Sequence, residues 1–219
     1  MFVEFLDRLR CPAEHADTWL VAAATRTAHR RLIEATLGCP ECGAEYALRG
    51  GELWFGQRVD STPMAASENE AMRLAALLKL EERGLYLLDG GWAVFDGSLR
   101  ALLDVAVLVV DPPSLPEFAE AGEGTLRGVG DRWPLAAAAF HGIALDRATP
   151  ARTADAVRLL RAGGRLVAPS SATVPPGVRE LARDDRHWVA EKADDVVPLS
   201  RAHFRSAVAT PRFPGTAPR

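Results

Sequence analysis

The sequence has few lysines, tyrosines and cysteines, and it has no long apolar run. Lys79 and Lys192 are the only lysines, so arginine supplies nearly all of the 26 basic residues, and 29 acidic residues set the net charge at −3. This balance excludes the strongly basic surface of a general nucleic-acid-binding protein, and leaves a specific nucleic-acid partner open. The longest apolar run, residues 101–110, contains Asp104 and is too short to span a bilayer.

The first residues, MFVEFLDRLRC, do not form a signal peptide, because Glu4, Asp7 and Arg8 interrupt them and no basic-then-apolar order exists. We therefore expect a cytoplasmic protein with no membrane association. Hydrophobic residues make up 48% of the chain, which is enough for a sizeable core. Three cysteines in a cytoplasmic chain favour a metal site or catalysis over a disulfide framework.

Two Cys-Pro turns, far apart in the chain, have the spacing of a zinc site. In Cys39-Pro40-Glu41-Cys42-Gly43 the two-residue gap lets both thiolates face one ion, and Gly43 permits the positive φ of such a turn. The upstream turn supplies Cys11 and His15, and its longer gap suits an imidazole. Because structural zinc takes four thiolate or imidazole ligands, the pattern predicts a site made of Cys11, His15, Cys39 and Cys42.

Two alternatives to this site remain open. A CxxC pair can be a redox couple, but such a motif normally opens a helix, whereas a glycine and a strand-like run follow Cys42. His15 can be an ordinary surface histidine, with Asp17 or a water molecule as the fourth ligand.

The segments around the two turns predict a small antiparallel sheet. Residues 18–26 and 29–38 read as two strands with a turn near Thr27 and Ala28, which would return residue 15 to the side of residue 39. Residues 44–56 then read as a third strand, a Gly-Gly turn and a short fourth strand. We interpret residues 1–56 as a zinc ribbon.

This part of the chain resembles the small zinc-ribbon proteins that serve as activating subunits of tRNA, rRNA and protein methyltransferases. The matching positions are Cys11-Pro12, Cys39-Pro40-Glu41-Cys42, Tyr46, Gly50 or Gly51, and Phe55. The family usually has a cysteine where this chain has His15. The resemblance implies bound zinc and a ribbon that can extend its sheet with the edge strand of another protein.

The rest of the chain alternates between predicted strands and helices. Residues 57–68 read as a linker in which Ser67 caps the next helix and Glu70 completes a capping box. Predicted helices cover 69–84, 97–104 and 152–163, and predicted strands cover 85–89, 105–111, 124–130, 139–146, 165–170 and 187–193. This order predicts an α/β fold: after the small β zinc ribbon, a doubly wound, mainly parallel Rossmann-like sheet over residues 69–205. The Pro-rich end, 206–219, is expected to be a mobile tail.

Acidic and glycine residues follow three of the predicted strands, where ligands of such sheets bind. They are Asp89-Gly90-Gly91, Asp111, and Gly130-Asp131. A carboxylate at the end of the second strand can accept both hydroxyls of a ribose. Aspartate is also a common turn and helix-cap residue, so both interpretations of Asp111 stay open.

The order of elements resembles class I S-adenosylmethionine-dependent methyltransferases. The stretch AVRLLRAGGRLVAPS (156–170) is the best match, to the family's helix, Gly-Gly turn and fifth strand. The resemblance implies S-adenosylmethionine as cofactor, with Asp89, Gly90, Gly91, Asp111 and Asp131 as the residues that bind it and Asp131 facing the adenine.

The chain also departs from that family. Only Gly90 and Gly91 remain of its glycine loop, and Trp92 and Phe95 can fill the cofactor cleft. The end of the fourth strand lacks the Asn-Pro-Pro-aromatic pattern of amine methylation, no catalytic base is assignable, and little room is left for a closing hairpin. We therefore expect a zinc-binding methyltransferase-like protein that acts as a non-catalytic scaffold or partner-binding protein. The alternative is an active methyltransferase acting on RNA, a protein or a small molecule.

Overall fold

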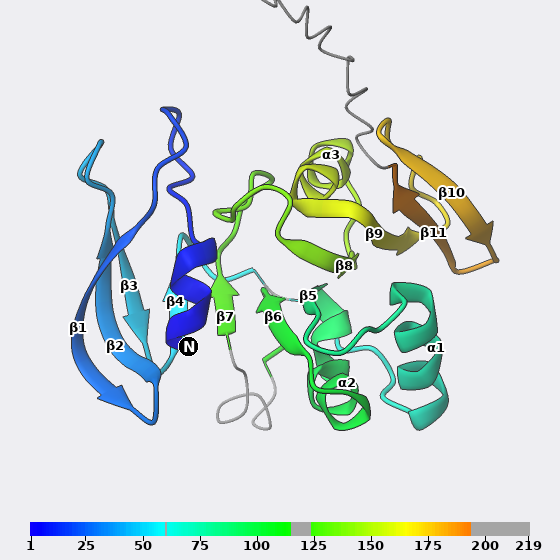
Figure 1. The fold of residues 1–219 in the computed structure, drawn as a ribbon, viewed down its shortest axis with the longest axis horizontal. Helices are drawn as coiled ribbons and strands as arrows, with labels where there is room; N and C mark the ends of the chain where they lie inside the picture. The colour runs from blue at the N-terminus through cyan, green and yellow to red at the C-terminus, as the bar shows by residue number, and fades with distance from the viewer. Residues whose placement is uncertain (60, 115–123, 194–219) are drawn as a thin grey trace, which may run out of the picture.

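A computed structural model describes residues 1–59, 61–114 and 124–193 of the 219-residue chain, so the predicted tail at 206–219 lies outside the described residues. In these ranges eleven strands form one continuous sheet in the order β1-β2-β3-β4-β7-β6-β5-β8-β9-β11-β10 (Figure 1). Six consecutive strands, β4 to β9 in this order, pair parallel with one another, and the pairings at both ends of the sheet are antiparallel. The predicted α/β architecture is therefore confirmed.

The antiparallel end near the N-terminus, called the N-terminal sheet below, consists of strands β1 (Val21–Ala28), β2 (Arg31–Gly38), β3 (Glu45–Arg49) and β4 (Glu52–Trp54). His29 and Arg30 both have positive φ and form the two-residue turn between β1 and β2. The turn predicted near Thr27 and Ala28 was placed two residues early.

The central strands are connected as in doubly wound folds. They are β7 (Gly124–Arg127), β6 (Ala106–Val110), β5 (Leu85–Asp89), β8 (Phe140–Ala144) and β9 (Leu160–Pro169). The chain runs outward from β5 through β6 to β7 and then returns to β8 on the other side of β5. The order therefore reverses between β5 and β8, and ligands of such sheets bind beyond the carboxyl ends of strands at this reversal.

A hairpin closes the far end of the sheet. β11 (His187–Lys192) pairs antiparallel with β9, and β10 (Val178–Arg183) pairs antiparallel with β11. The expectation that little room remained for such a hairpin was wrong. β10 was missed because it is exposed along most of its length and shows no apolar alternation.

Helices lie on both faces of the central strands. Alternate residues of the strands join two different clusters: one cluster contains α1 (Glu68–Leu78) and α2 (Asp96–Leu102), and the other contains α3 (Pro150–Leu159). The side chain of Ser67 accepts a hydrogen bond from the Glu70 amide, which confirms the predicted cap. No helix within the described ranges is long and apolar enough to cross a bilayer.

Two helices end earlier than the sequence predicted. α1 ends at Leu78 because Lys79 has a φ of 52° and turns the chain into the left-handed region. α3 ends at Leu159, and the strand begins at once instead of after Gly163-Gly164. The ammonium group of Lys192 donates to the carbonyls of Val157 and Leu160, so a residue distant in the sequence satisfies the end of this helix.

The first residues pack against the central sheet. A 3₁₀ helix, η1 (Val3–Arg8), places Phe5 beside Gly124, where a Cβ atom would approach the Phe5 ring to 3.0 Å. The following residues pair with the segment before β8: the Arg10 amide donates to the Pro134 carbonyl at 2.9 Å, and Leu9 forms a bridge with Leu135. One apolar cluster therefore contains buried residues of both the N-terminal sheet and the central strands.

Strands β4 and β7 join the two parts of the sheet by parallel pairing, with Leu53 opposite Leu126. The guanidinium of Arg127 donates to the Glu52 carboxylate from Nη2 at 2.7 Å and from Nε at 3.1 Å. The Phe55 amide donates to the Arg127 carbonyl at 2.9 Å. The Arg127 side chain is 5% exposed and the Glu52 side chain 27% exposed, so the guanidinium is buried at the joint while the carboxylate keeps some contact with water.

We predict that Arg127→Met lowers the free energy of unfolding by about 2–4 kcal/mol, because it leaves the Glu52 carboxylate without its partner beside a buried strand pair. The matched control is Arg26→Met, which removes an exposed pair with Glu34 and should cost at most about 1 kcal/mol. Urea unfolding of both variants measures the difference, and equal losses would contradict a structural role for the joint.

Candidate metal centre and strand-end cluster

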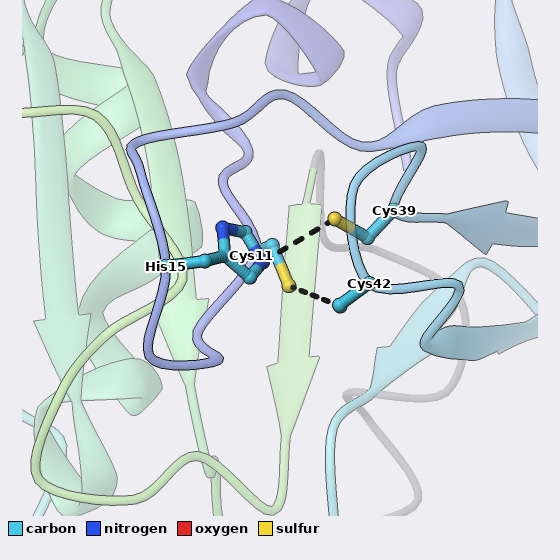
Figure 2. Close-up of side chains that lie close together, drawn as sticks. All are labelled: Cys11, His15, Cys39 and Cys42. Atoms are coloured by element: carbon cyan, nitrogen blue, oxygen red, sulfur yellow. Dashed lines mark hydrogen bonds between the residues drawn. The ribbon is translucent and has the colours of Figure 1, made fainter.

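The four predicted metal ligands lie together between the two Cys-Pro turns (Figure 2). The Sγ atoms of Cys11 and Cys42 are 3.7 Å apart, the Sγ of Cys39 is 3.4 Å from Nε2 of His15, and all four ligand atoms lie within 4.8 Å of one another. Zinc bonds of about 2.3 Å to sulfur in a tetrahedron would place two sulfurs about 3.8 Å apart. The cluster could therefore hold a tetrahedral metal ion.

Backbone hydrogen bonds fix the downstream turn. Cys39 follows β2 directly, the Gly43 amide donates to the Cys39 carbonyl at 2.9 Å, and the Cys39 amide donates to the Ala44 carbonyl at 2.8 Å. Gly43 has a φ of 71°, a value that glycine adopts without strain. A strand, not a helix, follows this turn, which disfavours the redox alternative.

His15 presents its Nε2 atom to the sulfurs because its other ring nitrogen has a partner. Nδ1 lies 2.6 Å from the Ala16 carbonyl, to which it can only donate, and 3.3 Å from a Glu41 carboxylate oxygen. This is the arrangement by which proteins orient a metal-binding histidine. Asp17, the alternative ligand, instead pairs with Arg10 at 3.2 Å.

The cysteines differ in their surroundings. Burial raises the pKa of the Cys11 thiol. Burial also acts to raise the pKa of Cys39, but the Cys42 and Glu41 amides that face its sulfur, together with the neighbouring thiols, lower that pKa to about 7. Amides directed at a sulfur favour the thiolate, which is the form that binds a metal.

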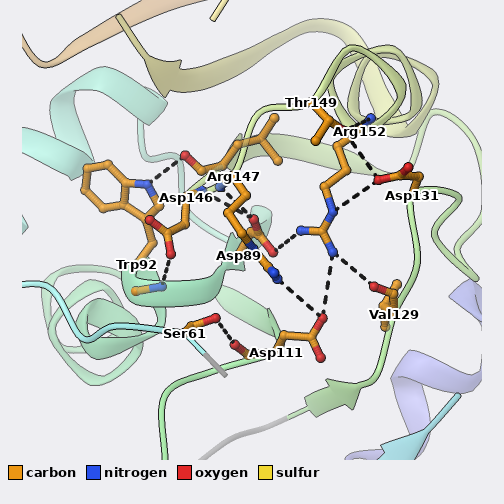
Figure 3. Close-up of polar contacts among 12 residues, drawn as sticks. Ser61, Asp89, Trp92, Asp111, Val129, Asp131, Asp146, Arg147, Thr149 and Arg152 are labelled. Atoms are coloured by element: carbon orange, nitrogen blue, oxygen red, sulfur yellow. Dashed lines mark hydrogen bonds and ion pairs between the residues drawn. The ribbon is translucent and has the colours of Figure 1, made fainter. Parts of the chain in front are cut away.

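At the carboxyl ends of the central strands, Asp89 and Asp111 are completely buried and face arginines from beyond β8 (Figure 3). The Asp89 carboxylate accepts from Nη1 of Arg152 at 2.8 Å and, more weakly, from the backbone amides of Asp146 and Arg147 at 3.3 Å each. Burial raises the pKa of Asp89, and the guanidinium of Arg152 opposes that rise. We call Asp89, Asp111, Asp131, Arg147 and Arg152 the strand-end cluster.

Asp111 accepts hydrogen bonds through both its carboxylate and its backbone carbonyl. Its Oδ1 accepts from the Gly128 amide at 2.6 Å, and its carbonyl accepts from the Ser61 hydroxyl at 2.8 Å. Its Oδ2 lies 3.7 Å from Nη2 of Arg152 and 3.9 Å from Nη2 of Arg147. Burial raises the pKa of this carboxyl, although the Gly128 amide and the arginines act against the rise.

The glycine loop after β5 is covered by other parts of the chain. The Gly91 amide donates to the Asp146 carboxylate at 3.0 Å, and a Cβ atom at Gly90 would lie 2.4 Å from that carboxylate. A Cβ atom at Gly91 would lie 2.5 Å from the Thr62 carbonyl. Asp146 follows β8, whereas Thr62 belongs to the predicted linker, 57–68. Residues 56–59 and 61–64, here called the strap, contact the ends of β7, β6 and β5 in turn.

Trp92 and Phe95 do not occupy this cleft. Both are buried in the cluster on the face of α1 and α2, and the indole of Trp92 donates to the Leu145 carbonyl at 3.1 Å. The suggestion that these two rings fill the cleft was therefore wrong. Asp146, Thr62 and Met64 cover the glycine loop instead.

Three members of this region, Asp146, Arg147 and Arg152, were not predicted from the sequence. A signal was present for Arg152: it lies in the first turn of α3, after the Thr149 cap, where a cation is unfavourable to the helix dipole and calls for an anionic partner. Asp131, which was predicted, is mostly exposed and lies 3.8 Å from Nε of Arg152.

These residues do not fit a bound S-adenosylmethionine in the arrangement described. Such a cofactor needs an open glycine loop and a carboxylate free to accept ribose hydroxyls. Here the loop amide, the Asp89 carboxylate, Oδ1 of Asp111 and the space above Gly91 are taken by groups of the same chain, whereas Oδ2 of Asp111 has no hydrogen-bond partner.

No family model matches the sequence, and no curated protein matches it either. Several solved methyltransferases have a similar fold. TrmN from Thermus thermophilus is 18% identical, with a TM-score of 0.42 over 59% of this chain and 50% of its own. A putative S-adenosyl-L-methionine-dependent methyltransferase from Methanococcus maripaludis is 11% identical, with a TM-score of 0.45 over 59% of this chain and 86% of its own.

A third structure is the complex between the Haloferax volcanii Trm112 methyltransferase activator and a putative methyltransferase. It is 16% identical, with a TM-score of 0.38 over 45% of this chain and 50% of that one. The chain thus spans about half the length of TrmN and of the matched chain in this complex. At these identities and TM-scores the likeness carries no conclusion about what this chain does.

We predict that Gly91→Ala lowers the free energy of unfolding by about 1–3 kcal/mol, because the added methyl group would meet the Thr62 carbonyl of the strap. Gly97→Ala is the matched control: no atom lies within 4 Å of the position that its Cβ would take, and in helix α2 the change should stabilise by up to about 1 kcal/mol. Thermal unfolding distinguishes the two. A neutral Gly91→Ala would mean that the strap does not cover the loop in solution.

Proposed function

We propose that this chain is a zinc-binding protein with a methyltransferase-like fold that performs no methyl transfer and acts by binding another protein. Its N-terminal sheet would be a zinc ribbon built into the same sheet as the Rossmann-like strands. Cys11, His15, Cys39 and Cys42 would hold the ion. A closed site of this kind stabilises a fold and has no open position for a substrate.

The zinc assignment is supported by the chemistry and spacing of the four donors. Three sulfurs and one imidazole nitrogen are the ligand types of structural zinc sites, and the separations of 3.7 Å and 3.4 Å suit a tetrahedron. The His15 ring is already oriented by the Ala16 carbonyl. Zinc supplies no chemistry to a reaction in this assignment.

The absence of methyl transfer is supported by one observation above all. The Asp146 carboxylate takes the Gly91 amide, and Arg152 takes the Asp89 carboxylate, so two of the groups expected to bind S-adenosylmethionine are occupied by the chain itself. A cofactor would have to displace an ion pair whose two members are nearly or completely buried.

The proposed partner would bind at the ribbon. β4 is already paired with β7, so the free edge of the N-terminal sheet is the outer side of β1. This strand is exposed along almost its whole length, and Trp19 and Val21 near its start are more than half exposed. An extended segment of another protein can pair with such an edge.

An active S-adenosylmethionine-dependent methyltransferase is the second candidate. Within the described residues, Oδ2 of Asp111 and Nε and Nη2 of Arg147 are buried and have no hydrogen-bond partner. A ligand that carries hydroxyl groups could satisfy these atoms if the strap moved away. RNA, a protein or a small molecule would then be the methyl acceptor.

The purified protein should contain about one zinc ion per chain, as four-ligand structural sites do. Cys39→Ser and His15→Ala should lose most of this zinc because three ligands bind it far more weakly than four. His29→Ala is the matched control, since His29 lies in the β1–β2 turn outside the metal cluster. Metal analysis gives the content. A full zinc equivalent in Cys11→Ala/Cys39→Ala would refute the assignment.

Calorimetry with S-adenosylmethionine should give no detectable heat, because the cofactor would have to break the Asp89–Arg152 pair. The same titration with Asp111→Ala is the control for binding at the strand ends. Binding at a dissociation constant of about 1–100 μM, lost in Asp111→Ala, would favour the enzyme instead.

A further inference from the structure

The three carboxylates predicted to bind a cofactor all face the same guanidinium group, that of Arg152 (Figure 3). Its Nη1 is 2.8 Å from Asp89, its Nη2 is 3.7 Å from Asp111, and its Nε is 3.8 Å from Asp131. Nη2 also donates to the Val129 carbonyl at 3.0 Å. The three aspartates follow three different central strands, so the guanidinium lies where the strand ends converge.

Burial makes this guanidinium necessary. Asp89 and Asp111 are fully buried, and the Arg152 side chain is only 5% exposed. Two buried carboxylates without a cation are strongly unfavourable. A guanidinium suits the position because it is planar, always charged and has five N–H donors directed outward. The ring of Trp133 lies 5.6 Å from its central carbon and covers it from one side.

Among the residues that the structure describes, no other cation can take over this role. Arg147 reaches only Asp111, at 3.9 Å, and its side chain is 40% exposed. Without Arg152, Asp89 would retain only two long backbone hydrogen bonds of 3.3 Å. The site would then be an enclosed, negatively charged space with the dimensions of the lost side chain.

We propose that Arg152 is an internal ligand: it occupies a cation-binding site formed by the ends of β5, β6 and β7, and a small guanidinium compound can replace it. This proposal deepens the proposed function. It rests on one premise of that function, namely that the chain's own groups close the cleft. The ligand class is a planar monocation that donates several hydrogen bonds. In the native protein the occupied site fixes the start of α3 to the strand ends.

Arg152→Ala in the full-length, metal-loaded protein tests this proposal. Its melting temperature should fall by about 10 °C, because two buried carboxylates lose their cation. Ethylguanidinium at about 10 mM should restore about 3 °C or more of that loss by binding the vacated site. Ethylurea, which has nearly the same shape and no charge, should restore none, and neither compound should stabilise the wild-type protein.

Arg100→Ala is the matched control variant. Arg100 forms two hydrogen bonds with Asp96 at 2.8 Å each, but its side chain is 27% exposed, so its removal leaves no enclosed site. Ethylguanidinium should not stabilise this variant. Equal effects of ethylguanidinium and ethylurea on Arg152→Ala, or equal rescue of Arg100→Ala, would overturn the proposal.

If Arg152→Ala does not fold, Arg152→Gln and the double variant Asp89→Asn/Arg152→Gln keep the proposal testable. The double variant should melt higher than Arg152→Gln because it removes one uncompensated charge. If the double variant instead lost as much melting temperature, relative to the wild-type protein, as Asp89→Asn and Arg152→Gln lose together, the internal-ligand role would be contradicted. Binding of S-adenosylmethionine to the wild-type protein would overturn the proposed function while leaving this comparison intact.

Discussion

The parallel pairing of β4 with β7 is the constraint on which the rest of the structure depends. It turns two small sheets into one, and it places the Arg127–Glu52 ion pair at the joint. A strand edge that is already paired is closed to other chains. The N-terminal sheet is consequently anchored to its own neighbour, and the first residues, including Phe5, can cover the face of the central strands beside it.

A series of contacts outside this joint connects the metal cluster with the strand-end cluster. The residue before Cys11 donates to the Pro134 carbonyl, the neighbouring Trp133 amide donates to Asp155 of α3, and the Trp133 ring lies over Arg152. These contacts place the segment 133–135 between the metal-binding turn and Arg152. The strap, which starts two residues after the end of β4, runs across the strand ends.

The sequence predicted those features that depend on local spacing. Ligand types and gaps were sufficient to predict that Cys11, His15, Cys39 and Cys42 lie together, and strand–helix alternation was sufficient for the α/β architecture. Features that depend on distant partners were not predicted. Lys192 satisfies carbonyls at the end of α3, although it lies more than thirty residues further along the chain. The exposed strand β10 is recognised by its pairing with β11. Arg152 finds its carboxylate partners only where the ends of three strands meet.

Hydrogen exchange with and without a zinc chelator tests most directly whether the two parts of the sheet form one unit. If the β4–β7 joint couples them, removal of the metal should weaken protection of amides in β7 and of the Leu135 and Ala136 amides as well as in the metal-binding turns. Loss of protection confined to residues 10–50, with β7 unchanged, would contradict this coupling and would show that the N-terminal sheet is an independent attachment.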